Sequence, residues 1–203
     1  MASGAVSARA ALGFVVLLLS AGLVILLQLP WTAVWLGVAV LIPIALYPLA
    51  KRVTNWPQAV LGVVFSYAAP MGWVAATGAL TMPGLLLWLA GFCWILGYDT
   101  IYAHQDRDDD ALVGIRSSAR TLGERTGPFL IGVFGGTIAL LAAAGLAAGL
   151  NRFFLLGLAL PASHFAWQVR RLNIYDPAAC LRLMHSNRDV GLLIALALLL
   201  GRV

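Results

Sequence analysis

The stretch Ala10–Leu29, AALGFVVLLLSAGLVILLQL, decides the fold class. It contains no charged residue and is roughly 20 residues long, the length that an α-helix needs to cross the hydrocarbon core of a bilayer. Arg9 precedes the run, so a secretory signal peptide is an alternative, but the run ends at Gln28-Leu29-Pro30 without the small residues of a cleavage site. We therefore predict a membrane-spanning helix that stays in the mature protein.

Comparable apolar blocks make up most of the remaining chain. Of the 203 residues, 62% are hydrophobic and 10% are charged, whereas about a quarter of the residues of a soluble domain are charged. Several prolines stand near block edges, where the first turn of a helix needs no backbone N–H. The sequence thus predicts an all-α, polytopic transmembrane helical bundle that forms a single domain. It has about seven spans, at residues 10–29, 33–50, 58–77, 84–104, 128–149, 153–169 and 189–201.

The basic residues indicate an orientation in the membrane. The net charge of +5 would suit a nucleic-acid-binding protein, but Lys and Arg lie in the gaps between spans and form no basic face, so no nucleic acid is expected as a partner. They gather in the N-terminal segment and in segments 51–57, 105–127 and 170–188, whereas the alternate gaps hold only Arg152 and Arg202. Because cytoplasmic loops retain positive charge, we predict that the N-terminus and these three segments are cytoplasmic.

The segment 98–110, YDTIYAHQDRDDD, carries the strongest chemical signal. At about 100° per residue, Asp99, Asp106 and Asp110 would fall within about 40° of one another on a helix, with Tyr102 beside them. Carboxylates that share a face at a membrane edge repel unless a cation compensates them. Mg²⁺ prefers oxygen ligands and leaves coordination positions for substrate phosphates. The pattern therefore predicts a site for Mg²⁺ and a diphosphate.

Other interpretations of these charges stay open at this point. The acidic residues could be a solvated charge run at a helix end that pairs with Arg107 and Arg116. Lys51-Arg52 could bind a diphosphate, or could only offset a helix dipole and fix the topology. The cysteines and histidines show no metal or disulfide spacing, and the chain has no P-loop, nucleophile elbow or dinucleotide fingerprint. Enzyme classes that rest on those motifs are therefore not expected.

Four stretches together resemble UbiA-type aromatic prenyltransferases, particularly the bacterial 4-hydroxybenzoate polyprenyltransferases of ubiquinone synthesis. They are 47–58 (YPLAKRVTNWPQ), 97–110 (GYDTIYAHQDRDDD), 114–118 (GIRSS) and 186–189 (SNRD). The resemblance extends over essentially the whole chain. It implies an all-helical membrane fold of nine spans with a cavity that opens to the cytoplasmic side and to lipid.

The resemblance also implies the site residues. In the family, two Asp-rich motifs face each other and hold Mg²⁺ and the diphosphate of a polyprenyl donor. Carried over to this chain, the second motif gives catalytic roles to Asp99, Asp106 and Asp110, which would bind the metal with Asp109 as a helper. The candidates for contact with the substrates are Lys51, Arg52, Tyr102 and Arg116.

The implied reaction is transfer of a polyprenyl group from polyprenyl diphosphate to 4-hydroxybenzoate, at the ring carbon ortho to the hydroxyl. The allylic C1–O bond ionises while Mg²⁺ neutralises the leaving group, the ring attacks the carbocation, and loss of a ring proton restores aromaticity. The expected partners are the two substrates and membrane lipid. The expected location is the bacterial inner (cytoplasmic) membrane, with the active site on the cytoplasmic side.

Two departures from the family pattern qualify this expectation. Arg116 and Ser118 stand where relatives often have Lys and Thr. The first Asp-rich motif is missing, because no acidic residue precedes Asp99 and the chain begins at what looks like the third span of the family. We therefore expect an N-terminally incomplete prenyltransferase domain. The alternatives are an inactive or partner-dependent fragment, a prenyltransferase for another aromatic acceptor and, more distantly, a membrane transporter.

Overall fold

The computed structural model describes residues 7–112 and 114–202, and it describes them without the side chains of Lys51, Asp108, Asp109 and Ala111. Every regular element in these ranges is helical, which confirms the predicted all-α class. The elements are α1 Ala8–Leu26, α2 Trp31–Ala39, α3 Leu41–Val53, α4 Pro57–Ser66, α5 Ala68–Thr77, α6 Met82–Ala103, α7 Arg107–Leu112, α8 Ser118–Leu122, η1 Gly123–Arg125, α9 Thr126–Ala147, α10 Arg152–Gly157, α11 Ala159–Arg171, α12 Pro177–His185 and α13 Asn187–Leu200.

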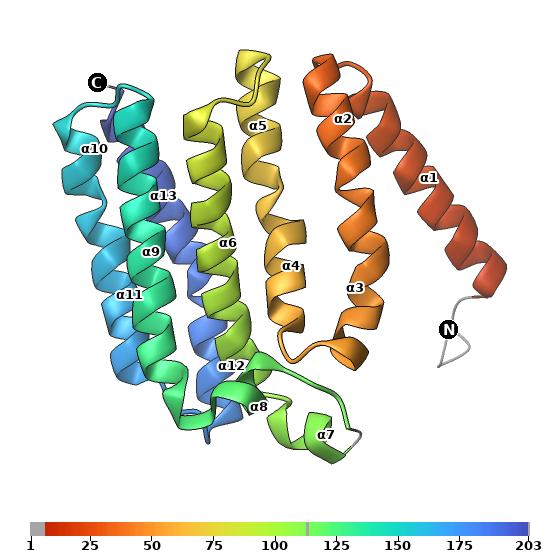
Figure 1. Cartoon of the computed structure of the whole chain (residues 1–203), viewed down its shortest axis with the longest axis vertical. Helices are drawn as coiled ribbons and strands as arrows, with labels where there is room; N and C mark the ends of the chain where they lie inside the picture. Colours follow the sequence, from red (N-terminus) through yellow and green to blue (C-terminus); the bar gives the residue numbers. More distant parts are fainter. Residues whose placement is uncertain (1–6, 113, 203) are drawn as a thin grey trace.

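The long helices stand side by side and run roughly along one direction (Figure 1). In the described part of the chain, six helical stretches are long and apolar enough to cross a membrane. They are Ala8–Leu26, Trp31–Ala50, Pro57–Thr77, Met82–Ala103, Ser118–Ala147 and Pro177–Leu200. The predicted membrane bundle is therefore confirmed, and its last span is longer than the predicted 189–201.

The predicted span at 153–169 differs from the others. The region is helical, as α10 and α11, and it packs beside α9 and α13 (Figure 1). However, α11 carries His164, Gln168 and two arginines, and the region is not among the six apolar stretches. Gln168 is fully buried and donates from Nε2 to Ser186 Oγ at 3.0 Å. Packing against the protein, rather than apolar composition, thus makes this region part of the bundle.

Four of the helical stretches are interrupted at a single residue, and a proline explains three of the interruptions. These three breaks fall at Val40, Tyr67 and Leu158, each of which is followed three positions later by a proline: Pro43, Pro70 and Pro161; the fourth break, at Ser186 between α12 and α13, has no such proline. A proline has no N–H to donate to the carbonyl four residues earlier, and its ring crowds that carbonyl. The helical hydrogen-bond ladder is therefore broken locally, while the chain continues in nearly the same direction (Figure 1).

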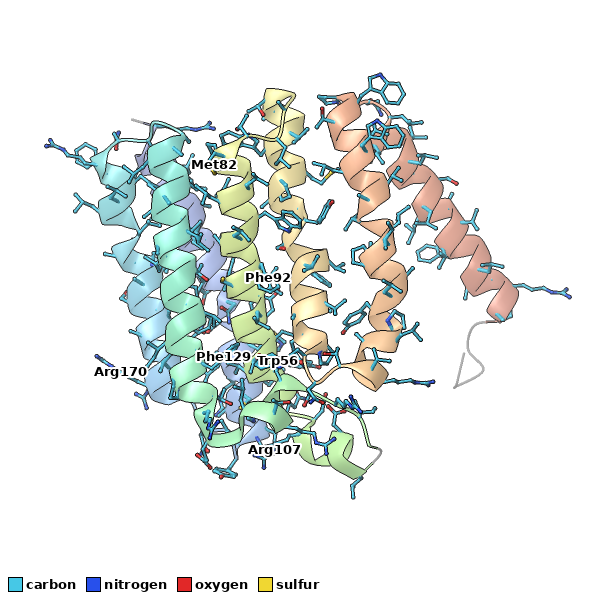
Figure 2. All side chains as sticks on the ribbon, viewed as in Figure 1. Trp56, Met82, Phe92, Arg107, Phe129 and Arg170 are labelled. Carbon is cyan, nitrogen blue, oxygen red and sulfur yellow. The ribbon has the colours of Figure 1, made fainter. Side chains whose placement is uncertain are left out.

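The three polar segments lie at one end of the bundle. The α3–α4 connection, the region of α7 and α8 and the α11–α12 connection are all at the lower end in Figure 1, together with the start of α1. Figure 2 places Arg107 at this end and Met82 at the opposite one. The structure therefore confirms that segments 51–57, 105–127 and 170–188 share one side of the bundle.

Close packing of α6 against its neighbours fixes the helix that carries the acidic segment. A Cβ added at Gly97 on α6 would lie 2.4 Å from Cε1 of Phe134 on α9. A Cβ added at Gly62 on α4 would lie 3.1 Å from Cδ2 of Phe92 on α6. Small residues allow such close approach of helices in membrane proteins. The two contacts hold α6 between α4 and α9 and so determine where Asp99 lies.

Candidate functional site

The acidic segment does not continue α6 as one helix. The helix ends at Ala103, and α7 begins at Arg107. In the turn between them, the N–H of Gln105 donates to the carbonyl of Tyr102 at 2.8 Å, which is a tighter i→i−3 bond. The prediction that a single helix face aligns the carboxylates is therefore wrong.

The turn nevertheless brings the three predicted carboxylates to one cavity. Asp99 belongs to α6, Asp106 precedes α7, and Asp110 lies within α7. They border a cavity of about 60 Å³. Its complete lining is Tyr47, Pro57, Gln58, Asp99, Tyr102, Ala103, Asp106 and Asp110. We call this space the acidic cavity. It lies between the middle of α3, the start of α4, the end of α6 and the segment that includes α7.

Asp106 and Asp110 bring negative charge to the acidic cavity that no described side chain pairs with. Asp110 is only 8% exposed, and no described Lys or Arg forms an ion pair with it or with Asp106. The N-terminus of α4 borders the cavity at Pro57, and the partial positive charge of a helix N-terminus offsets a fraction of this charge. The cavity is therefore suited to a cation, or to a ligand that brings one.

The donor chemistry of the acidic cavity fits Mg²⁺. Among the described residues, no group of three His, Cys, Asp or Glu side chains is arranged to hold a metal by itself. Mg²⁺ does not need such a cage, because it usually binds one or two carboxylates and completes its shell with water and substrate phosphates. The carboxylates of Asp99, Asp106 and Asp110 are ligands of this kind. The side chain of Asp109, the fourth predicted ligand, lies outside the described part of the chain.

Hydrogen bonds join three segments behind the acidic cavity. The N–H of Ser118 donates to Gln58 Oε1 at 2.9 Å, and Ser118 Oγ lies 2.9 Å from Thr100 Oγ1. Ser118 and Thr100 are both fully buried. Because Thr100 directly follows Asp99, these bonds tie the position of Asp99 to the start of α4 and to the start of α8.

The predicted basic residues with described side chains do not line the acidic cavity. Arg116 reaches the end of α3 instead, where its Nη1 donates to the carbonyl of Val53 at 3.1 Å. Arg52 is exposed near the end of α3, and the side chain of Lys51 lies outside the described part. Of the predicted substrate contacts, Tyr102 is the one that the structure places at the cavity.

His104 is buried directly after α6. Its Nε2 lies 2.9 Å from Thr126 Oγ1, and the hydroxyl of Thr126 donates to the carbonyl of Gly123 at 2.7 Å. His104 must therefore be the donor, with its proton on Nε2, and its Nδ1 has no partner among the described residues. Burial, and next the nearby Arg107, lower the pKa of His104 to about 4. The imidazole is therefore neutral at physiological pH.

A second, larger cavity borders the same part of α6. Its volume is about 530 Å³, and most of its wall is apolar. Its lining is Phe65, Ser66, Ala68, Ala69, Gly91, Trp94, Ile95, Tyr98, Met184, His185, Asn187 and Arg188. Tyr98 lines this apolar cavity, and the next residue, Asp99, lines the acidic one. A space of this size and composition suits a hydrocarbon chain.

Two polar residues of the acidic cavity, Tyr47 and Gln58, were not predicted to be site residues. Both lie in the stretch 47–58 on which the family resemblance partly rests. Tyr47 precedes Lys51 by four positions, and this spacing places both residues on one face of a helix. The sequence pattern could therefore have indicated Tyr47 as a site residue. Gln58 follows Pro57 at the start of a helix, which gives no comparable signal, because its partner Ser118 is 60 positions away.

These features define a class of protein. The chain is a helical membrane protein whose acidic cavity lies beside an apolar one, at the end of the bundle where its polar segments gather. Such a pair of cavities can accommodate a ligand with an anionic head and a hydrocarbon body. The model of the UbiA prenyltransferase family matches residues 1–197, so the chain belongs to that family.

Individual relatives agree with this assignment. The "4-hydroxybenzoate polyprenyltransferase, mitochondrial" of Drosophila melanogaster is 40% identical over 202 residues, which cover 99% of this chain and 52% of that protein. The protein of the same name from Schizosaccharomyces pombe is 41% identical over 204 residues, which cover 98% of this chain and 57% of that protein. The chain therefore spans about half the length of these curated relatives.

Solved structures show the same fold. A UbiA homolog from Aeropyrum pernix K1 superposes with a TM-score of 0.82 at 26% identity, covering 99% of this chain and 75% of that one. A digeranylgeranylglyceryl phosphate synthase superposes with a TM-score of 0.73 at 20% identity, covering 99% of this chain and 72% of that one. The second likeness concerns the fold alone.

Proposed function

We propose that the chain transfers a polyprenyl group from polyprenyl diphosphate to the ring of 4-hydroxybenzoate, ortho to the hydroxyl, in ubiquinone biosynthesis. The names of its relatives supply the acceptor. The observation that carries the proposal is that consecutive residues of α6 line the two cavities, Tyr98 the apolar one and Asp99 the acidic one. A prenyl diphosphate has the same two parts, a charged head and a hydrocarbon body.

The reaction breaks the allylic C1–O bond of the donor and forms a C–C bond to the acceptor ring. The diphosphate leaves with the electron pair, and the ring proton is released to restore aromaticity. Asp99, Asp106 and Asp110 would hold Mg²⁺, whose charge would neutralise the leaving diphosphate. Trp94 and Phe65, in the wall of the apolar cavity, would keep water away from the allylic cation.

For the location, we propose a bacterial inner membrane, with the acidic cavity on the cytoplasmic side. The concentration of Lys and Arg in segments 51–57, 105–127 and 170–188 supports this orientation. The relatives named above are mitochondrial proteins. Fractionation of cells of the source organism, with blots against marker proteins of each membrane, tests the assignment.

Transfer to ring-labelled 4-hydroxybenzoate tests the proposed activity. The chain would be produced in membranes of a host that lacks such an enzyme, and its insertion would be verified. We expect labelled prenylated product with Mg²⁺ and none after chelation. Asp99→Asn should lower the rate roughly a hundredfold, because it removes a negative ligand but keeps the shape of the side chain. Asp176→Asn is the matched control, since Asp176 lines neither cavity and asparagine can still accept the N-cap hydrogen bond from the N–H of Ala179, which is 2.9 Å long.

Each component of the proposal has its own contradicting outcome. Full activity of Asp99→Asn, or product formation without Mg²⁺, would show that the acidic cavity is not the active site. Transfer to a different aromatic acid but not to 4-hydroxybenzoate would change the acceptor. Absence of transfer by well-inserted wild-type chain would contradict the activity of this chain by itself.

A further inference from the structure

Gln58 has a polar environment that none of the predicted roles explains. It is the second residue of α4 and is only 5% exposed. It borders the acidic cavity together with Asp99, Asp106 and Asp110. A buried, neutral amide among three carboxylates calls for a specific hydrogen-bonding role, because each unpaired polar group in such a place is costly.

The hydrogen bond from Ser118 decides how the amide of Gln58 is oriented. A backbone N–H can only donate, so the atom that it meets at 2.9 Å must be the carbonyl oxygen of Gln58. Ser118 is fully buried, and its hydroxyl bonds to Thr100, so this donor is well fixed. The amino group, which is the other branch of the amide, is thereby turned away from Ser118.

The amino group of Gln58 retains open space in front of it. No described residue accepts a hydrogen bond from this amino group, and protein atoms do not fully enclose it. The open space that Gln58 borders is the acidic cavity. Two N–H donors therefore remain available to a ligand in a cavity whose other polar groups are mainly carboxylates.

These donors indicate the chemistry of the ligand group. An N–H donor needs an acceptor, and a phosphate oxygen that enters with a cation is an acceptor whose charge the cavity can then tolerate. The N-terminus of α4, which begins at Pro57 beside Gln58, also favours an anion at this point. We propose that Gln58 is a substrate-binding residue that donates hydrogen bonds to the diphosphate of the prenyl donor. This inference rests on the proposed function.

The substitution Gln58→Glu isolates the donor role. Glutamate keeps an oxygen to accept from the N–H of Ser118, but it presents a second oxygen to the cavity where glutamine presents an N–H₂ group. Gln58→Met removes the donors and also the oxygen that accepts from Ser118, but adds no charge, so it separates loss of hydrogen bonds from repulsion. Gln28→Glu is the matched control, since Gln28 is exposed beyond the end of α1, at the opposite end of the bundle.

Binding of Mg²⁺-pyrophosphate to the purified full chain gives a readout that does not need catalysis. We expect the wild-type chain and Gln28→Glu to be stabilised against heat by this probe and the two Gln58 variants to lose most of the shift. In the transfer assay, KM for the prenyl diphosphate should rise about ten- to a hundredfold in the Gln58 variants, because a hydrogen bond to a charged oxygen is lost. KM for 4-hydroxybenzoate should change little.

Several outcomes would overturn the inference. These are wild-type affinity for Mg²⁺-pyrophosphate in both Gln58 variants, a raised KM for the aromatic acceptor alone, or a wild-type chain that binds no Mg²⁺-pyrophosphate. The unliganded melting temperature of each variant shows whether it folds. If wild-type chain binds Mg²⁺-pyrophosphate through Gln58 but transfers no prenyl group, the proposed function fails while the inference stands.

Discussion

Replacing Gly97 with alanine should destabilise the bundle, because α6 and α9 leave no room for a methyl group there. The added Cβ would lie 2.4, 3.0 and 3.1 Å from Cε1, Cδ1 and Cζ of Phe134, whereas carbon atoms in contact are about 3.5–4.0 Å apart. The Phe134 ring would have to retreat by about 1 Å. It is 2% exposed and stacked on Phe165 with ring centroids 4.2 Å apart, so the helices must separate instead.

The expected size of the effect follows from two opposing contributions. Adding a methyl group to a tightly packed core destabilises by about 1–3 kcal/mol, and the short contact at Gly97 places this substitution in the upper part of that range. Alanine is also a better helix former than glycine by about 0.5–1 kcal/mol. The net loss in free energy of unfolding for Gly97→Ala should therefore be about 1–2 kcal/mol.

Unfolding by SDS in mixed micelles measures this free energy. Gly135→Ala on α9 is the matched control, because a Cβ there would meet no atom within 4 Å. This control should be at least as stable as the wild type. Phe134→Leu should partly relieve the clash, so in the double mutant with Gly97→Ala the two losses should be less than additive by about 1 kcal/mol.

Two results would refute the reasoning about Gly97. The first is equal stability of Gly97→Ala and Gly135→Ala, which would mean that the close contact of α6 with α9 is absent. The second is strict additivity of Gly97→Ala and Phe134→Leu, which would mean that the two residues do not touch.

Two further perturbations test other parts of the bundle. Trp94 Nε1 donates to Asn187 Oδ1 at 2.8 Å and links α6 to α13, so Trp94→Phe should lower the free energy of unfolding in SDS by about 1–2 kcal/mol. The control is Trp35→Phe, at an exposed tryptophan of α2. An equal or smaller loss in Trp94→Phe than in this control would contradict the link. His104, with its pKa lowered to about 4, stays neutral in the folded chain while the unfolded chain takes up a proton near pH 6.5. The free energy of unfolding should therefore fall, by up to about 3 kcal/mol, as the pH is lowered from 6.5 to 4. His104→Gln should make the free energy of unfolding depend less on pH. An unchanged pH dependence in this variant would contradict the prediction.

Much of the fold could be predicted because its signals are local. Apolar blocks such as Ala10–Leu29 are long enough to span a bilayer by themselves, and six of the seven predicted spans correspond to apolar helical stretches of the structure. Pro43, Pro70 and Pro161 interrupt their own helices, which is again a local effect. The region 153–169 is the exception, because its polar residues belong in the bundle only through their partners on other helices.

The candidate site was predicted in part. Asp99, Asp106 and Asp110 do border one cavity, but they meet there through the turn after Ala103 and not along one helix. The roles assigned to them remain predictions. Arg116 was expected near the substrate, and the structure directs it to the carbonyl of Val53. No rule of spacing along a helix could have given either result, since both depend on how separate segments meet.

The sequence by itself determined that this protein is a membrane bundle, where its spans lie and at which end its charges gather. These properties follow from interactions of each segment with the bilayer or with its own backbone, which are short in range along the chain. Only the tertiary structure decided which side chains share the acidic cavity and that Gln58 is one of them. The partner that orients Gln58 is Ser118, 60 positions away, and contacts of that range form only when α4, α6 and the segment before α9 pack together.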